Sequence, residues 1–168
     1  MQSNPENLLS SHMLPRTKAR IAAIQALYQM EISGVDVGEV VKEFQKLRFI
    51  PRGKKKQVNL DINEDEIEDL SDADVSFFSE LVRCQREIDP IIHEQLAKGW
   101  KLVRVDSILR AILRAGVFEI LQMKNIPSRV VINEYINISH AFFSEDEPRV
   151  INGILDKIGR INRADEFT

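Results

Sequence analysis

Basic, amide and aromatic side chains gather at the start of the first amphipathic stretch of this 168-residue chain. Arg16, Lys18 and Arg20 precede and open the stretch, and Gln25 and Tyr28 follow within it. Arginine and lysine neutralise phosphates through an attraction that salt weakens. An amide and an aromatic ring can read and stack on unpaired bases, which is how proteins usually recognise single-stranded RNA. The pattern therefore indicates a binding site for a single-stranded nucleic acid.

A structural explanation of the same residues stays open. Basic residues at a helix start can form a solvated face, and Tyr28 shares the helical spacing of the apolar residues Ile21, Ile24 and Leu27. Positive charge near a helix N-terminus opposes the helix dipole, so helix stability does not account for the basic residues. From spacing alone we weigh the two explanations equally.

The sequence contains no pattern typical of catalysis. It has no Gly-rich phosphate loop, no His-x-x-x-His or Cys-x-x-Cys pair and no Gly-x-Ser-x-Gly motif. His12, His93 and His140 are scattered, and we expect His140 to be structural rather than catalytic. The acidic run 61–74 lacks the residue spacing of a calcium loop. We therefore expect no enzymatic activity, no metal and no cofactor.

Charge is distributed unevenly along the chain, although the net charge is only −3. Residues 1–60 hold ten basic against five acidic side chains, whereas residues 61–74 hold eight acidic ones and no basic one. A polyanion responds to local charge, so the basic first third is compatible with nucleic-acid binding. The lone Cys84 fits a reducing compartment, and the first 14 residues lack the features of a signal peptide. We expect a cytoplasmic protein.

The spacing of apolar residues predicts an all-α protein of about seven helices. Their expected places are 17–33, a stretch opened by Asp36, a stretch opened by Ser71 with Asp74, 90–98 after an Asp89–Pro90 cap, 103–123, 129–143 and a last helix that Pro148 begins. We expect one helical domain, 15–160, between a disordered tail, 1–14, and a C-terminal tail, 161–168. Within it, a charged loop at 48–70 is either disordered or functional.

The segment 103–123 has the highest apolar density, and we expect other helices to surround it. Asp106, Arg110 and Arg114 interrupt it at intervals of four residues, which places them on one line that must reach water or a partner. In the last helix, Gly153 suggests that another helix packs closely against it.

Four segments, taken in order, resemble the NusB family of bacterial transcription antitermination factors. They are 20–28 (RIAAIQALY), 108–110 (ILR), 126–134 (with IP and VINE) and 150–157 (VINGILDK). The resemblance spans about residues 16–160, and VINE and VINGILDK are its most specific parts. It implies an all-helical fold of two subdomains. It also implies binding of boxA, a single-stranded element of nascent RNA, together with the ribosomal protein NusE, in RNA polymerase complexes that support ribosomal RNA transcription.

The resemblance also implies roles for individual residues. The RNA-contacting positions that it implies are Arg16, Lys18, Arg20, Gln25 and Tyr28 in the first helix and Arg110 in the central helix. Asp146 matches an acidic position beside the RNA surface, where it would temper affinity.

Two further positions, Asp106 and Glu134, would face NusE. For Arg114, to which the resemblance assigns nothing, we expect a structural ion pair. Three positions depart from the family pattern: Thr17 interrupts an arginine-rich run, Val150 replaces an aromatic residue that some members carry at the RNA surface, and Ser128 replaces a tyrosine.

Two alternatives belong to other functional classes. One is a helical protein–protein scaffold, such as a homodimer, that binds no specific RNA. The other is an RNA cytosine methyltransferase, since some of these enzymes carry a NusB-like helical domain at the N-terminus. Few residues follow the helical segment here, so we expect no cofactor-binding α/β domain and favour the antitermination factor.

Overall fold

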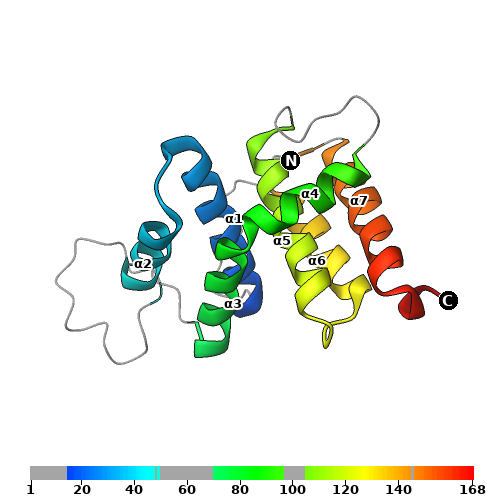
Figure 1. Ribbon diagram of the computed structural model, residues 1–168, viewed down its shortest axis with the longest axis horizontal. Coiled ribbons are helices and arrows are strands. Elements are labelled where there is room, and N and C mark those ends of the chain that lie inside the picture. The colour runs from blue at the N-terminus through cyan, green and yellow to red at the C-terminus, as the bar shows by residue number, and fades with distance from the viewer. Residues whose placement is uncertain (1–14, 48, 50–69, 97–104, 145) are drawn as a thin grey trace. The chain divides into compact units, whose positions relative to one another are not determined.

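The computed structural model describes residues 15–47, 49, 70–96, 105–144 and 146–168. These residues form α-helices and one short 3-10 helix, with no strand among them (Figure 1). The elements are α1 (Pro15–Ser33), α2 (Val37–Leu47), α3 (Asp72–Arg83), α4 (Gln85–Gln95), α5 (Ser107–Gln122), α6 (Ser128–Ser139), α7 (Glu147–Asn162) and η5 (Ala164–Phe167). The all-α prediction and the expected number of helices are confirmed. The N-terminal tail 1–14 and most of the charged loop 48–70 lie outside the described residues.

The helices group into two compact units, α1 to α3 and α4 to η5. In the first unit, α1 packs against both α2 and α3. Pro15 begins α1, where its fixed φ suits the first helical turn. Gly34 follows the end of α1 with a φ of +68°, a left-handed conformation that favours glycine. Phe78 of α3 completes this core by contacting the rings of Phe44 and Phe49, with centroids 5.2 and 4.9 Å away.

Side-chain caps begin α2 and α3, as the sequence predicts. Asp36 accepts a hydrogen bond from the Gly38 amide at 2.9 Å. The Ser71 hydroxyl accepts from the Asp74 amide at 3.2 Å and donates to the Asp74 carboxylate at 2.6 Å. These bonds satisfy amides that have no partner within the helix.

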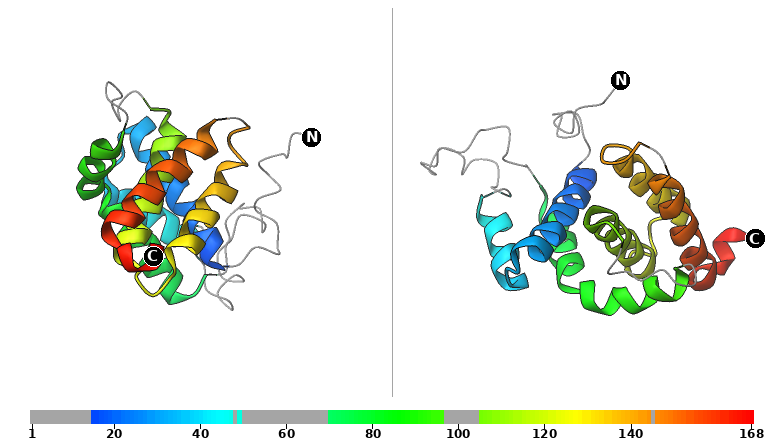
Figure 2. Two further views of the ribbon diagram at one scale, coloured as in Figure 1. Left: turned by 90° about the vertical axis from the view of Figure 1, so that its right-hand side faces the viewer. Right: turned by 90° about the horizontal axis from the view of Figure 1, so that it is seen from above.

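In the second unit, α5 is surrounded by α4, α6 and α7, and both views in Figure 2 show α5, α6 and α7 side by side. Nearly every residue from Leu109 to Ile120 is buried, as the apolar density of the segment predicts. Gly116 allows α7 to approach α5 closely, because a Cβ at this position would lie only 2.9 Å from Leu155 Cδ1 of α7. Gly153 does the opposite: a Cβ there would meet nothing within 4 Å, so the predicted close packing at Gly153 is wrong.

A buried polar contact joins α5 to α6. The Tyr135 hydroxyl donates a hydrogen bond of 2.8 Å to the Glu119 carboxylate, and both side chains are fully buried. Buried polar groups require such partners, so this contact fixes how the two helices pack.

The start predicted for the fourth helix at Asp89–Pro90 is wrong. Helix α4 begins at Gln85, after a turn at Cys84, and contains Pro90 in its interior. Proline there leaves one helical hydrogen bond unmade. Burial of Ile88 and Ile92, one turn apart on the same face, offsets that loss. The Asp89 side chain caps no helix and instead pairs with Arg114.

The central helix begins later than predicted, at Ser107 rather than at residue 103. Asp106 is its N-cap, and Asp106 Oδ1 accepts hydrogen bonds from the amides of Ile108 and Leu109 at 2.8 and 3.3 Å. Asp106 therefore serves as the cap of α5, and its carbonyl accepts the first helical hydrogen bond, from the Arg110 amide at 2.8 Å. Helix α6 likewise ends at Ser139, before the predicted residue 143, and a turn follows it.

Arg163 and Glu166 join the C-terminus to the α5–α6 connection. Arg163 is buried, and its guanidinium donates to the carbonyls of Lys124 and Ile126 at 3.1 and 2.6 Å. Glu166 pairs with Arg163 and accepts a 2.7 Å hydrogen bond from the Ser128 amide, the first in α6. A carboxylate at a helix N-terminus is favourable because it meets unpaired amides.

The Glu166 contact predicts a pH dependence of stability. The hydrogen bond from the Ser128 amide, followed by the contacts with the Ser128 and Arg163 side chains, lowers the pKa of Glu166 below its ordinary value. A group with a lowered folded-state pKa stabilises the fold above its unfolded pKa, about 4.3, and this stabilisation is lost as the pH falls through the folded pKa. Glu166→Gln should therefore lower the melting temperature at neutral pH, and this difference should shrink as the pH falls below about 4.3 and through the lowered folded-state pKa.

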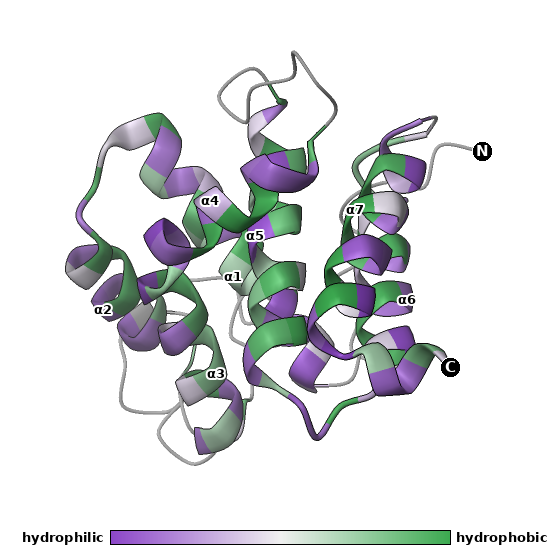
Figure 3. Cartoon of the chain, turned by 45° about the vertical axis from the view of Figure 1, so that its right-hand side comes forward, coloured by the Kyte–Doolittle hydropathy of each residue, from purple (hydrophilic) through white to green (hydrophobic). Residues whose placement is uncertain are grey.

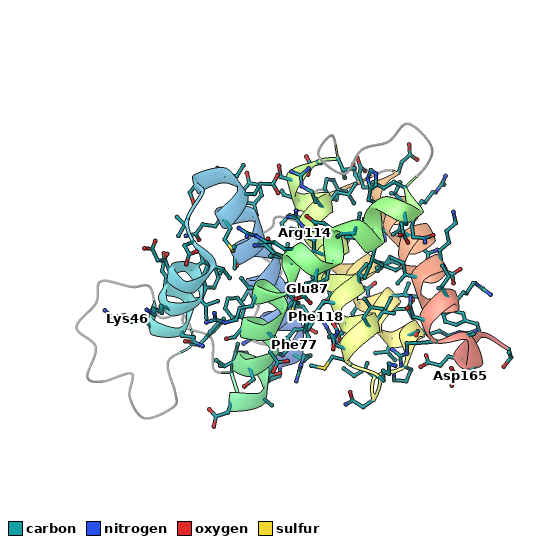
Figure 4. All side chains as sticks on the ribbon, viewed as in Figure 1. Lys46, Phe77, Glu87, Arg114, Phe118 and Asp165 are labelled. Atoms are coloured by element: carbon teal, nitrogen blue, oxygen red, sulfur yellow. The ribbon has the colours of Figure 1, made fainter. Side chains whose placement is uncertain are left out.

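The matched control is Asp165→Asn, because Asp165 is the exposed neighbouring carboxylate (Figure 4). Thermal unfolding of both variants followed by circular dichroism from neutral to acid pH checks the prediction. An equal difference from the unchanged chain at every pH for Glu166→Gln would contradict it.

Candidate nucleic-acid interface

Arg16, the first basic residue of α1, is held by α3. Its Nε donates to Asp74 Oδ1 at 2.8 Å, and its guanidinium lies 4.4 Å from the centroid of the Phe77 ring, which Figure 4 labels. The Asp74 side chain is only 9% exposed and that of Arg16 28%. The Asp74 carboxylate and the Phe77 ring thus occupy much of the Arg16 guanidinium, and its Nη1 atom is buried. Little of the guanidinium is left for a ligand. Arg16 therefore has a structural role that its position in the sequence did not indicate.

The other predicted residues of α1 differ in their access to solvent. Arg20 is buried at 4% exposure, and both Lys18 and Gln25 are half-buried. Tyr28 is 39% exposed, so of the two explanations left open for it, the one that places it in the core is wrong. The Tyr28 ring and the Lys18 ammonium can therefore contact a ligand without rearrangement of the core.

The sequence pattern did not single out one exposed residue of α1. Ile32 is 63% exposed and lies one helical turn after Tyr28. Together the two side chains form an apolar surface at the C-terminal end of α1. The only signal in the sequence is an isoleucine two residues before the helix-ending Gly34, which is too common to interpret.

Arg110 and Arg114, both of α5, are engaged inside the second unit. Arg110 is 7% exposed, and its Nη1 donates to the Val105 carbonyl at 2.9 Å. Burial, followed by the charge of Arg114, lowers the pKa of Arg110. Arg114 forms two hydrogen bonds with the carboxylate of Asp89, at 2.6 and 2.8 Å. The predicted structural ion pair of Arg114 is confirmed. Arg110, expected to reach water or a partner, does not reach water and instead contacts the Val105 carbonyl.

The exposed side of α7 carries charged residues. Asp146 precedes the helix and is exposed, and its side chain caps no amide. Arg149, Gly153 and Lys157 follow at intervals of three or four residues and are exposed as well. Asp146, predicted beside an RNA surface, thus stands on the same side of the helix as two basic residues.

The two residues predicted to meet a protein partner lie on different elements of the second unit. Asp106 is exposed and uses Oδ1 as the α5 cap, while Oδ2 accepts no hydrogen bond within the described residues. Glu134 of α6 is half-buried and engaged in a contact of its own. Of the two, Asp106 has the freer carboxylate oxygen for a partner.

Chemistry other than binding finds no support in the described part of the chain. There, no three histidine, cysteine, aspartate or glutamate side chains come together as metal ligands would. His93 and His140 are both exposed. No helix in the same ranges is long and apolar enough to cross a membrane.

Comparisons with known proteins agree with one another. The model of the NusB family matches residues 17–160. Curated relatives named transcription antitermination protein NusB include those of Rhodopseudomonas palustris, 43% identical over 91% of this chain and 83% of the relative, and Caulobacter vibrioides, 45% identical over 87% and 93%. A solved structure of T. maritima NusB is 26% identical, covers 92% of this chain and 97% of its own, and superposes with a TM-score of 0.69. A family match over most of the chain, relatives of this identity and the same helical fold together show that the chain belongs to the NusB family.

Proposed function

We propose that this chain is a transcription antitermination factor that binds boxA RNA together with NusE, within RNA polymerase complexes that support ribosomal RNA transcription. It acts in the cytoplasm, as a binding protein without catalysis. The observation that carries the proposal is the family match over residues 17–160, together with the names of its curated relatives. NusE and boxA come from the family resemblance.

In this proposal α1 contributes most of the direct RNA contacts. Lys18 neutralises a phosphate, and Tyr28, exposed on the same helix, stacks on a base. Gln25, which lies between Lys18 and Tyr28 in the sequence and is half-buried, forms hydrogen bonds with the edge of a base. Arg16 and Arg20 add positive charge from more enclosed positions. Arg110 reaches a phosphate only if its hydrogen bond to the Val105 carbonyl opens.

The remaining acidic positions adjust binding. Asp146 lies beside the RNA and lowers affinity by repelling phosphates, and Asp106 and Glu134 meet basic side chains of NusE. Charge complementarity of this kind raises the rate and specificity of association more than it raises affinity.

Lys18→Ala tests the RNA site with little risk to the fold, because the side chain is only half-buried and α1 keeps a good helix former. We expect boxA affinity to fall about three- to tenfold and the slope of log affinity against log salt to shrink by about 1. The measurement is a mobility-shift titration at several salt concentrations. Lys46→Ala, which removes an exposed lysine of α2 (Figure 4), is the matched control and should change neither quantity.

The same titration with a scrambled RNA, with and without NusE, tests specificity. Equal binding of boxA and scrambled RNA in both conditions would contradict the proposed function. A protein–protein scaffold would then be favoured by the exposed Tyr28–Ile32 surface. In that case Ile32→Ser should disrupt self-association measured by analytical ultracentrifugation.

A further inference from the structure

The start of α6 and the C-terminus form a small polar site within the second unit. The Ser128 amide, the first in α6, donates to Glu166 Oε2 at 2.7 Å, and Glu166 Oε1 pairs with Arg163 Nη2. The Ser128 hydroxyl is buried beside the same carboxylate. A helix N-terminus with a cation next to it is a favourable place for an anion. Glu166 is the anion that occupies this place.

The site offers more hydrogen-bond donors than the Glu166 carboxylate uses. The Arg163 side chain is 3% exposed, and its Nη2 atom contacts Glu166 and the carbonyls of Lys124 and Ile126. Its Nη1 atom is also buried and has no hydrogen-bond partner among the described residues. Buried donors normally have a partner, so the site has the capacity for a ligand with more oxygens than a carboxylate. The planar fork of a guanidinium suits the oxygens of a phosphate.

The donors of the site are held in place, whereas its carboxylate can leave. Two backbone carbonyls hold Arg163, and the Ser128 amide is part of α6. Glu166, by contrast, is exposed and belongs to the four-residue helix η5 at the end of the chain, where segments detach most easily. Figure 3 shows hydrophilic residues around this C-terminus. Lys124, whose carbonyl Arg163 contacts, and Arg129, next to Ser128, are exposed cations that favour an incoming anion.

We propose that the N-terminus of α6 and Arg163 form a binding site for a phosphate group, which Glu166 closes as an internal competitor. One phosphate oxygen replaces Glu166 Oε2 at the Ser128 amide, and the others accept hydrogen bonds from the Ser128 hydroxyl and from both Nη atoms of Arg163. Glu166 then leaves, because two anions repel each other at the same donors. Its departure releases η5, so the ligand changes the conformation of the C-terminus. The site does not depend on the RNA contacts proposed for α1.

Removal of the competitor tests the site. Full-length Glu166→Ala and its matched control Asp165→Ala, which removes the exposed neighbouring carboxylate, are titrated at constant ionic strength, with phosphate replacing chloride. Backbone amide signals in two-dimensional NMR report binding. We expect phosphate to bind Glu166→Ala about tenfold more tightly than it binds the unchanged chain, because the competing charge is gone, and the Ser128 amide signal to move most. Asp165→Ala should bind phosphate as the unchanged chain does.

Two probes distinguish the sources of the phosphate group. Inorganic phosphate represents the free anion, and adenosine monophosphate represents a phosphate ester. A gain in affinity for both probes in Glu166→Ala assigns the site to phosphate groups in general, whereas a gain for inorganic phosphate alone assigns it to the free anion. Either result supports the site.

A second substitution locates the ligand. Adding Ser128→Ala to Glu166→Ala removes the buried hydroxyl but keeps a good helix former, so the fold should be preserved. Phosphate affinity should then fall about tenfold, which corresponds to one hydrogen bond to a charged group. Far-UV circular dichroism checks the fold of each variant. Glu166→Gln, which removes the charge but keeps the length of the side chain, replaces Glu166→Ala if the latter does not fold.

Three results would overturn the site. An equal gain in Asp165→Ala would show that phosphate responds to the net charge of the chain. Unchanged affinity in the Ser128→Ala double variant would place the ligand elsewhere. A Ser128 amide signal of Glu166→Ala that stays the same in phosphate and in chloride would leave the Glu166 contact as a structural ion pair alone.

Discussion

Gly116→Val should lower the free energy of unfolding by about 3 kcal/mol, because overfilling a well-packed core typically costs 1–3 kcal/mol and a branched side chain lies at the upper end. The Cβ alone would lie 2.9 Å from Leu155 Cδ1, 3.0 Å from Leu155 Cδ2 and 3.4 Å from Tyr135 Cδ2. Leu155 and Tyr135 are both fully buried, so neither side chain has space into which it can move. Denaturant titration followed by circular dichroism measures the loss.

A second glycine of the same unit provides the control. At Gly153 the Cβ meets nothing, so Gly153→Ala should raise the free energy of unfolding by about 1 kcal/mol, which is the difference in helix propensity. Gly116→Ala should fall between the two, since the gain in propensity opposes the contact with Leu155. Equal changes in the free energy of unfolding for alanine at 116 and at 153 would show that α7 does not pack closely against α5 at Gly116.

Features that depend on neighbouring residues were predictable from the sequence. The caps at Asp36 and Ser71 and the end of α1 at Gly34 each follow from a few adjacent residues. The burial of 109–120 follows from an apolar periodicity that leaves no face for water. Such signals act through the local backbone, so they do not require knowledge of what packs nearby.

Features that depend on distant partners were not predictable. The Asp89–Pro90 pair has the pattern of a helix start, but both residues lie in the interior of α4. The Asp89 carboxylate caps no helix there and instead pairs with Arg114, 25 residues away. The enclosure of Arg16 likewise follows from Asp74 and Phe77, which lie on another helix. A basic residue before a helix has the same pattern whether it is solvated, paired or bound to phosphate. The sequence could therefore indicate which residues are candidates for the interface, but it could not predict how accessible each side chain is.

Arg16→Ala should lower the free energy of unfolding by about 3 kcal/mol, near the lower end of what removing one partner of a buried ion pair costs. The remaining Asp74 side chain is only 9% exposed, and among the described residues its carboxylate keeps the hydrogen bond from the Ser71 hydroxyl. The variant also uncovers the Phe77 ring on which the guanidinium lies. Arg16→Lys keeps the charge but not the planar contact with that ring, so about 1 kcal/mol should be lost.

A double-mutant cycle with Asp74→Asn isolates the pair. If the ion pair is the cause, Arg16→Ala should cost less free energy of unfolding in the Asp74→Asn background than in the unchanged chain, because no buried carboxylate is then left without a partner. Losses that simply add would assign the effect to Phe77 instead. The same variants, titrated with boxA RNA at a temperature where all remain folded, separate the two roles of Arg16. Arg16→Lys should keep most of the RNA affinity if Arg16 contributes charge to the RNA surface. Should Arg16→Ala also bind as the unchanged chain does, Arg16 serves the fold alone, and Lys18 is the residue of this helix start that meets the phosphate.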